Sequence, residues 1–278
     1  MKIGIFFLTY KPNPCLLNFL PKLKSSNYDI YLVIDDNSQK YLKIKNIEIL
    51  QIEDSVCINS GYYNTFYDVP LTNLTAEQSK CTAIDKAFYY FCLNSDKYDY
   101  VWIIEDDVLI TSLKSILLLD RKYIGYDLLT SKNEINTNGA LDWLWPLAKK
   151  NFNLPWASSM MNIFRLSKKY VELIKDYVNK NHRLEFPETF YNTFAIHNNL
   201  KLDTPKELST CLWRKDWNPV DFKRNYFYHP VKNFIKHEEY RNNLLQIGGK
   251  NKNKKSKKRR NYKKRKSKFN SLNSLNHL

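Results

Sequence analysis

Short apolar runs alternate with amphipathic stretches along the first 110 residues. The runs have the length of β-strands, and the stretches between them carry apolar residues at helical spacing. Strands and helices that alternate in this way form a parallel sheet with crossover helices. The pattern therefore predicts an α/β fold with a mostly parallel sheet flanked by helices. The expected strands are 2–9, 28–34, 47–52 and 99–104, and a short helix opened by Pro14 is expected at 14–24.

The clearest helical pattern covers residues 76–93. Its apolar positions include Ile84, Ala87 and Phe88, and Thr75 with Gln78 would form a capping box at its start. The second half of the chain is less regular. There the pattern predicts a strand at 158–165, a helix at 167–179 with Ser167 as N-cap, a helix at 187–199 opened by Pro187, and an irregular aromatic-rich stretch at 204–240.

The basic charge of the chain is concentrated near its end. The net charge is +16, but residues 250–268 hold 13 of the 44 Lys and Arg, which leaves 31 basic against 28 acidic residues elsewhere. We therefore expect a folded, nearly neutral body at 1–246. Residues 247–278 are expected to form a disordered basic tail that contacts anionic surfaces or nucleic acid weakly.

The cysteines and the hydropathy profile indicate which cellular compartment the protein occupies. The five cysteines are odd in number and no two have CxxC spacing, so neither a zinc site nor a disulfide framework is expected, and a reducing compartment fits. No stretch approaches the ~18 apolar residues of a transmembrane helix. These features predict a cytoplasmic protein, and the basic tail adds nuclear import as a second possibility.

Acidic residues follow two of the expected strands. An apolar strand ends in Glu105, Asp106 and Asp107, and another ends in Asp35 and Asp36. In open α/β sheets, ligands bind beyond the carboxyl ends of the strands. Clustered carboxylates there would suit Mg²⁺ or Mn²⁺ and, through the metal, a diphosphate. The competing interpretation is that each cluster is a solvated turn, in which Asp and Asn bond their own backbone.

Four segments in this order resemble the GT-A fold of nucleotide-sugar glycosyltransferases, in a form similar to family 2. Residues 33–38 look like the early nucleotide-binding segment, and 103–107 look like the DxD segment, although the first acid is Glu105 rather than Asp. Residues 186–190 look like the acidic motif of inverting members, and 228–232 look like a late His element. The resemblance covers residues 1–235. The tail is similar to those of many proteins from large DNA viruses, and a viral protein would be expected in the host cytoplasm or in the virion.

The resemblance implies a role for each part of the body and for each candidate residue. Residues 1–110 would be a nucleotide-binding half and residues 111–246 an acceptor-binding half. Asp107 and His229 would bind Mn²⁺ or Mg²⁺. Glu188 would be the general base, unless Glu185 takes that role. Trp156 would be an aromatic platform for the acceptor, although most Trp residues belong to a core. The residues expected to contact the nucleotide are Thr9, Asp35, Asp36, Lys80, Glu105, Asp106 and Lys232.

The predicted function is therefore metal-dependent transfer of a hexose from a nucleoside diphosphate sugar, UDP-linked, to a hydroxyl of a glycan, protein or lipid, with inversion. A sugar nucleotidyltransferase is disfavoured because residues 10–14 contain no glycine for a phosphate loop. The sequence also leaves two non-enzymatic functions open. One is a degenerate GT-A binding module, and the second is a nucleic-acid- or polyanion-binding protein that acts through the tail. The near-neutral body disfavours duplex binding.

Overall fold

The computed structural model describes residues 1–64 and 81–243. The strands in this part of the chain are β1 (Ile3–Thr9), β2 (Tyr28–Ile34), β3 (Glu48–Leu50), β4 (Tyr100–Glu105), β5 (Leu109–Ile110), β6 (Leu128–Leu129), β7 (Glu134–Asn136), β8 (Trp156–Ser158), β9 (Ile163–Ser167), β10 (Leu202–Asp203) and β11 (Phe227–Tyr228). The helices are α1 (Pro14–Phe19), α2 (Asp54–Asn59), α3 (Ala83–Leu93), α4 (Leu113–Lys122), α5 (Trp145–Asn151), α6 (Lys168–Asn181), α7 (Pro187–His197) and a last helix at 234–243.

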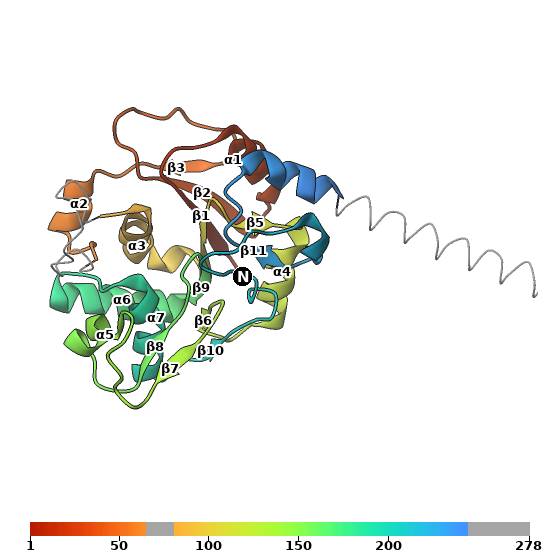
Figure 1. Ribbon diagram of the computed structural model, residues 1–278. Helices are drawn as coiled ribbons and strands as arrows, with labels where there is room; N and C mark the ends of the chain where they lie inside the picture. Colours follow the sequence, from red (N-terminus) through yellow and green to blue (C-terminus); the bar gives the residue numbers. More distant parts are fainter. Residues whose placement is uncertain (65–80, 244–278) are drawn as a thin grey trace, which may run out of the picture.

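The centre of the molecule is a seven-stranded sheet with the order β10-β6-β9-β4-β1-β2-β3 (Figure 1). Strands β4, β1, β2 and β3 are parallel to one another, whereas β9 runs antiparallel to both of its neighbours, β4 and β6. The predicted α/β fold with a mostly parallel sheet flanked by helices is confirmed. Strands from both predicted halves of the chain join this one sheet, and the division into a nucleotide half and an acceptor half stays a prediction.

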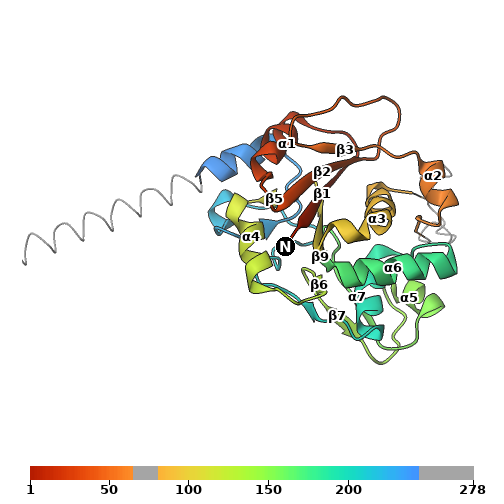
Figure 2. The same cartoon turned by 180° about the vertical axis from the view of Figure 1, so that it is seen from behind.

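Both faces of the sheet are covered, which explains why its central strands are apolar throughout. Phe6 and Leu8 of β1 pack in one core with α3, α6 and α7, whereas Ile5 and Phe7 pack in a second core with α1 and α4. Figures 1 and 2 show these helices on the two sides of the sheet. Because successive side chains of a strand point to opposite faces, a strand buried on both sides needs apolar residues at every position.

A buried ion pair joins α4 to the sheet. Nη1 of Arg165 lies 3.0 Å from Oδ1 of Asp120, and neither side chain is exposed. Trp102 donates from Nε1 to Oδ1 of the same carboxylate, and the Tyr28 hydroxyl donates to Oδ2. These additional hydrogen bonds offset the cost of removing two charges from water, a cost that an isolated buried pair often fails to recover.

The structure changes several of the expected element boundaries. The strand expected at 158–165 is wrong as one element, because β8 ends at Ser158 and β9 begins at Ile163. The expected third strand is shorter and covers Glu48–Leu50. The helix after Ser167 is confirmed, and the Ser167 side chain accepts from the Tyr170 N–H as its N-cap.

The helix predicted for residues 76–93 is described only in part. Within the described residues it begins at Ala83, because Thr82 is extended and forms a capping box with Asp85. The start expected at residue 76, the capping box of Thr75 and Gln78, and Lys80 lie outside the described residues, as does the predicted tail. No helix in the described part of the chain is both long and apolar enough to cross a membrane. All five cysteines are free.

Candidate metal and nucleotide site

A cavity of about 400 Å³ opens at the carboxyl ends of β1, β2 and β4. These three strands are parallel, so the residues that follow them meet at one edge of the sheet, where open α/β folds bind ligands. The N-terminus of α7 also lines the cavity. Six of the residues singled out from the sequence line this cavity: Thr9, Asp35, Glu105, Asp106, Asp107 and Glu188.

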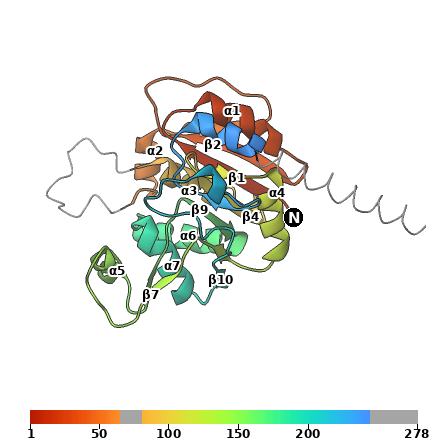
Figure 3. The same ribbon diagram turned by 45° about the vertical axis from the view of Figure 1, so that its right-hand side comes forward.

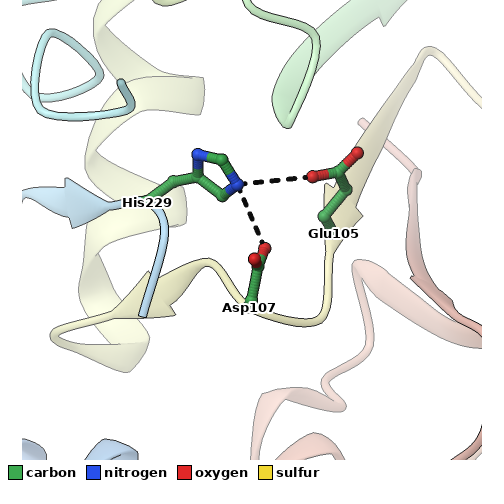
Figure 4. Close-up of side chains that lie close together, drawn as sticks. All are labelled: Glu105, Asp107 and His229. Atoms are coloured by element: carbon green, nitrogen blue, oxygen red, sulfur yellow. Dashed lines mark ion pairs between the residues drawn. The ribbon is translucent and has the colours of Figure 1, made fainter. Parts of the chain in front are cut away.

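Glu105, Asp107 and His229 form a cluster that could hold a metal ion (Figure 4). Nε2 of His229 lies 3.2 Å from Oδ1 of Asp107 and 3.5 Å from Oε2 of Glu105. Two backbone contacts bring the histidine to the acids. Strand β11 pairs antiparallel with β5, directly after the acidic turn, and the Val231 N–H donates to the Asp107 carbonyl at 2.8 Å.

The hydrogen bonding of His229 suits a metal ligand. Its Nδ1 lies 2.6 Å from the carbonyl oxygen of Leu212. A carbonyl only accepts, so Nδ1 must donate, and this leaves Nε2 to face the two carboxylates. Metal-binding histidines almost always donate their other ring N–H to a carboxylate, a backbone carbonyl or water, which fixes the orientation of the ring. Burial alone would lower the pKa of His229, but the carboxylates of Asp107 and Glu105 raise it above its ordinary value.

The acids of the cluster also have the electrostatic character of a cation site. Oδ1 of Asp107 is buried and accepts no hydrogen bond within the described residues, apart from its approach to His229. Burial, with the charge of Asp107 nearby, raises the pKa of Glu105 to about 7, while a hydrogen bond of 2.5 Å from Asn162 favours its ionised form. A divalent cation would relieve this crowding of like charges, and two carboxylates with one imidazole are a donor set that fits Mn²⁺.

The middle acid has a different partner. Oδ2 of Asp106 accepts from the Thr9 hydroxyl at 2.5 Å, so its carboxylate points toward β1 rather than toward His229. Burial raises the pKa of Asp106. The three adjacent acids therefore point in different directions. Glu105 and Asp107 approach His229, whereas Asp106 bonds Thr9 at the end of β1.

Asp35 is held by a lysine that the sequence analysis missed. Nζ of Lys86, on α3, lies 2.8 Å from Oδ1 of Asp35 and 2.7 Å from Oδ1 of Asp54, and the lysine side chain is 0% exposed. Burial opposes its charge, but these two carboxylates outweigh burial and raise the pKa of Lys86. A lysine in an amphipathic helix is ordinarily solvated, and nothing in the sequence marked Lys86 as buried.

Asp36 does not line the cavity. Its Oδ1 accepts from the Ser38 N–H at 2.9 Å, and its Oδ2 accepts from the Tyr41 hydroxyl at 2.9 Å. The hydrogen bonds from Ser38 contribute most to lowering the pKa of Asp36 to about 2. Asp36 thus belongs to a local turn, which was the competing interpretation of this segment.

The two candidate bases occupy different environments. Glu188 lies in the first turn of α7 and lines the cavity, and burial raises its pKa. Glu185 lies outside the cavity lining and is held by three side chains. It accepts from Nε of Arg183 at 2.9 Å, from the Tyr177 hydroxyl at 2.7 Å and from Nδ2 of Asn151 at 2.7 Å. The structure therefore places Glu188, and not Glu185, in the cavity that the three acids line.

Trp156 and Lys232 do not line the cavity either. Trp156 is 4% exposed, stacks on Trp145 and donates from Nε1 to the Phe152 carbonyl, so its ring belongs to a small core. Lys232 is exposed and lines a separate cleft together with Trp213 and Trp217. Trp217 connects this cleft to the cluster, because its Nε1 donates to the His229 carbonyl.

No protein-family model and no curated protein matches the chain. Among solved structures, the chain is similar to the apo form of mouse xyloside xylosyltransferase 1, at 11% identity and a TM-score of 0.41 over 84% of this chain and 98% of that one. It is also similar to A197 from STIV, at 13% identity and a TM-score of 0.28 over 67% of this chain and 82% of that one. Both similarities are remote.

Proposed function

We propose that the protein is a GT-A-type glycosyltransferase that binds a nucleoside diphosphate sugar with the help of a divalent cation and transfers the sugar to a hydroxyl group. The observation that carries this proposal is the meeting of Glu105, Asp107 and His229 at the edge of a mostly parallel sheet, in a position that the GT-A resemblance implies for the metal. Glu188 lines the same cavity as Glu105 and Asp107 and is available as a base.

Mn²⁺ or Mg²⁺ would be held by Asp107 and His229, as the resemblance to the GT-A fold implies, with Glu105 as a further ligand. When bound, the cation would neutralise the charge that develops on the leaving diphosphate. The imidazole nitrogen favours Mn²⁺, because Mg²⁺ strongly prefers oxygen ligands. The backbone contacts to Leu212 and Asp107 hold the histidine in place without the ion.

The nucleoside would lie over the ends of β1 and β2. Asp35 would accept hydrogen bonds from the base or the ribose hydroxyls, as carboxylates do in dinucleotide folds. Lys86 orients Asp35. Burial raises the pKa of this carboxyl group, and the hydrogen bond and charge of Lys86 act in the opposite direction. Asp106 and Thr9 already bond each other, so we place them in the floor of this subsite. A UDP-linked hexose is the donor that we propose.

Glu188 would act on the acceptor. Its raised pKa strengthens it as a base compared with an ordinary carboxylate. As the acceptor oxygen bonds to the anomeric carbon, Glu188 takes the hydroxyl proton, and the bond from that carbon to the diphosphate oxygen breaks. Attack from the face opposite the diphosphate inverts the anomeric centre. Glu185 would serve to position the chain before α7 through its three hydrogen bonds.

Calorimetric titration of UDP into the full chain, with and without Mn²⁺, tests the proposal. We expect saturable binding that requires Mn²⁺ and that changes little between moderate and high salt. Binding through the basic tail would instead need no Mn²⁺ and would fall steeply with salt concentration. Equal binding with and without Mn²⁺ at high salt would contradict a metal-dependent nucleotide site.

A further inference from the structure

A second cavity, of about 270 Å³, lies beside α1, which packs on the opposite face of the central sheet from α3. It is bordered by α1, by the start of α4 and by the last helix at 234–243, which Figure 3 shows close to α1. It shares no lining residue with the catalytic cavity. It is therefore a separate site, and the glycosyltransferase proposal assigns no role to it.

Positive charge converges on this cavity from four segments of the chain. Its lining includes four basic side chains and one acidic side chain, Glu238. Within the described residues, none of the four cations has a carboxylate oxygen within ion-pair distance. Cations on a folded surface normally spread apart or pair with acids, so the convergence of four on one hollow indicates that an anion binds there. The four are Lys22, Lys114, Arg224 and Arg241.

Arg241 is the most informative member of the group. Its guanidinium carbon lies 4.0 Å from the centre of the Phe19 ring, so the aromatic face covers one side of the cation. Burial lowers the pKa of Arg241 to about 10. A stacked guanidinium keeps the N–H donors at its edge available, and these donors match the paired oxygens of phosphate or carboxylate. A bound anion would offset the cost of burying this charge.

We propose that this cavity binds a phosphate group carried on a small organic molecule. Three net positive charges suit a dianion better than a single carboxylate. The side-chain amides of Asn18 and Asn242, which also line the cavity, add further donors. Ligand pockets usually measure about 300–1,000 Å³, so the cavity is too small for a nucleotide sugar and fits a single phosphorylated head group.

Two sources can supply such a group: a free phosphate ester or the head group of an anionic lipid. Residues 241 and 242 line the cavity, and the sequence soon continues into residues 250–268 with their 13 Lys and Arg. That segment would strengthen binding wherever many phosphates lie together, as on a lipid surface. The shared chemistry is the phosphate, and the two sources are separated by experiment.

The first arm of the test titrates glycerol 3-phosphate into the full chain in the presence of a chelator, which prevents phosphate from binding through a metal at Asp107. Arg241→Gln is compared with Lys149→Gln. Lys149 is an exposed lysine on α5 that does not line the cavity. We expect saturable binding that weakens about tenfold or more in Arg241→Gln and is unchanged in Lys149→Gln.

The second arm measures sedimentation of the same proteins with phosphatidylcholine vesicles that contain or lack phosphatidic acid. Weaker sedimentation of Arg241→Gln than of Lys149→Gln, without binding of glycerol 3-phosphate, would support the lipid source. Both variants keep the basic tail, so its contribution cancels. Mn²⁺-dependent UDP binding and the melting temperature report whether each variant is folded and whether the catalytic proposal holds.

The proposal fails if Arg241→Gln behaves like Lys149→Gln in both arms, or if the wild-type chain binds neither probe. Lys114→Gln provides a second variant in case Arg241→Gln does not fold, because Lys114 is exposed and its loss leaves the core intact.

Discussion

Nε2 of His229 lies 3.2 Å from Oδ1 of Asp107, although the two residues are far apart in the sequence. Antiparallel pairing of β11 with β5 and the hydrogen bond from Val231 to the Asp107 carbonyl hold them at this distance. The candidate metal site is thus built on backbone contacts. We expect it to be preformed, and substitution of one ligand should leave the surrounding fold in place.

His229→Ala should weaken Mn²⁺ binding about 100-fold or more. It removes a direct ligand, and even the loss of a residue that only hydrogen-bonds to a ligand typically weakens metal binding about 10–100-fold. UDP binding in the presence of Mn²⁺ should fall with it. Titration of Mn²⁺ followed by electron paramagnetic resonance measures the free ion directly. Asp142→Asn, which changes an exposed acid away from the cluster, is the matched control. Unchanged Mn²⁺ affinity in His229→Ala would show that the cluster does not hold the ion.

Glu188→Gln should lower the transfer rate about 10²–10⁴-fold, since an amide cannot take the acceptor proton. UDP affinity should stay the same, because we assign no nucleotide contact to Glu188. The melting temperature should hold or rise, since burial opposes the charged form of this carboxyl group. Transfer rate, calorimetry and thermal unfolding together check these expectations. Sugar transfer at the wild-type rate would remove Glu188 as the base.

Glu185→Gln should affect stability more than transfer, in contrast to Glu188→Gln. The Glu185 carboxylate accepts hydrogen bonds from Arg183, Tyr177 and Asn151, and an amide cannot accept all of them without turning an N–H toward a donor. We expect a lower melting temperature and a smaller loss of transfer than for Glu188→Gln. If Glu185→Gln keeps its stability and loses transfer, the two glutamates have the reverse roles.

Lys86→Met should destabilise the fold by about 3 kcal/mol, because it leaves the carboxylates of Asp35 and Asp54 without their shared buried cation. It should also weaken UDP binding, since Asp35 loses the contact that orients it. Urea unfolding gives the stability change and calorimetry gives the affinity. Lys169→Met, at an exposed position of α6, is the control and should be near neutral. Equal unfolding midpoints for the two variants would contradict the structural role of Lys86.

His237 should make stability depend on pH between about 6.5 and 4. Burial lowers its pKa from 6.5 to about 4, and its Nε2 lies 2.6 Å from the Val231 carbonyl. In this window the imidazole is protonated in the unfolded chain and neutral in the folded chain. The free energy of unfolding therefore decreases as pH falls from about 6.5 to about 4, by roughly 3 kcal/mol in all. His237→Gln keeps a donor but cannot titrate. The stability difference between variant and wild type, measured by urea unfolding, should therefore change across the window, and a constant difference would rule out this role.

The strands that build the site could be predicted from the sequence, because their pattern is local. Strands β1, β2 and β4 are apolar at nearly every position, and a polar or acidic residue ends each strand or follows it directly, which indicates burial on both faces and a ligand edge. The N-cap of α6 at Ser167 was equally local. The placement of Asp35 and Asp107 at one cavity followed from parallel pairing alone.

The assignment of partners to the charged residues depended on the tertiary structure. Neither the division of Glu105, Asp106 and Asp107 between His229 and Thr9 nor the burial of Lys86 can be read from residue types, since each depends on segments distant in sequence. The same holds for the choice of Glu188 over Glu185 as the residue that reaches the cavity. Apolar periodicity reports burial along one element, whereas hydrogen bonds and ion pairs are set by where the side chains of different elements meet.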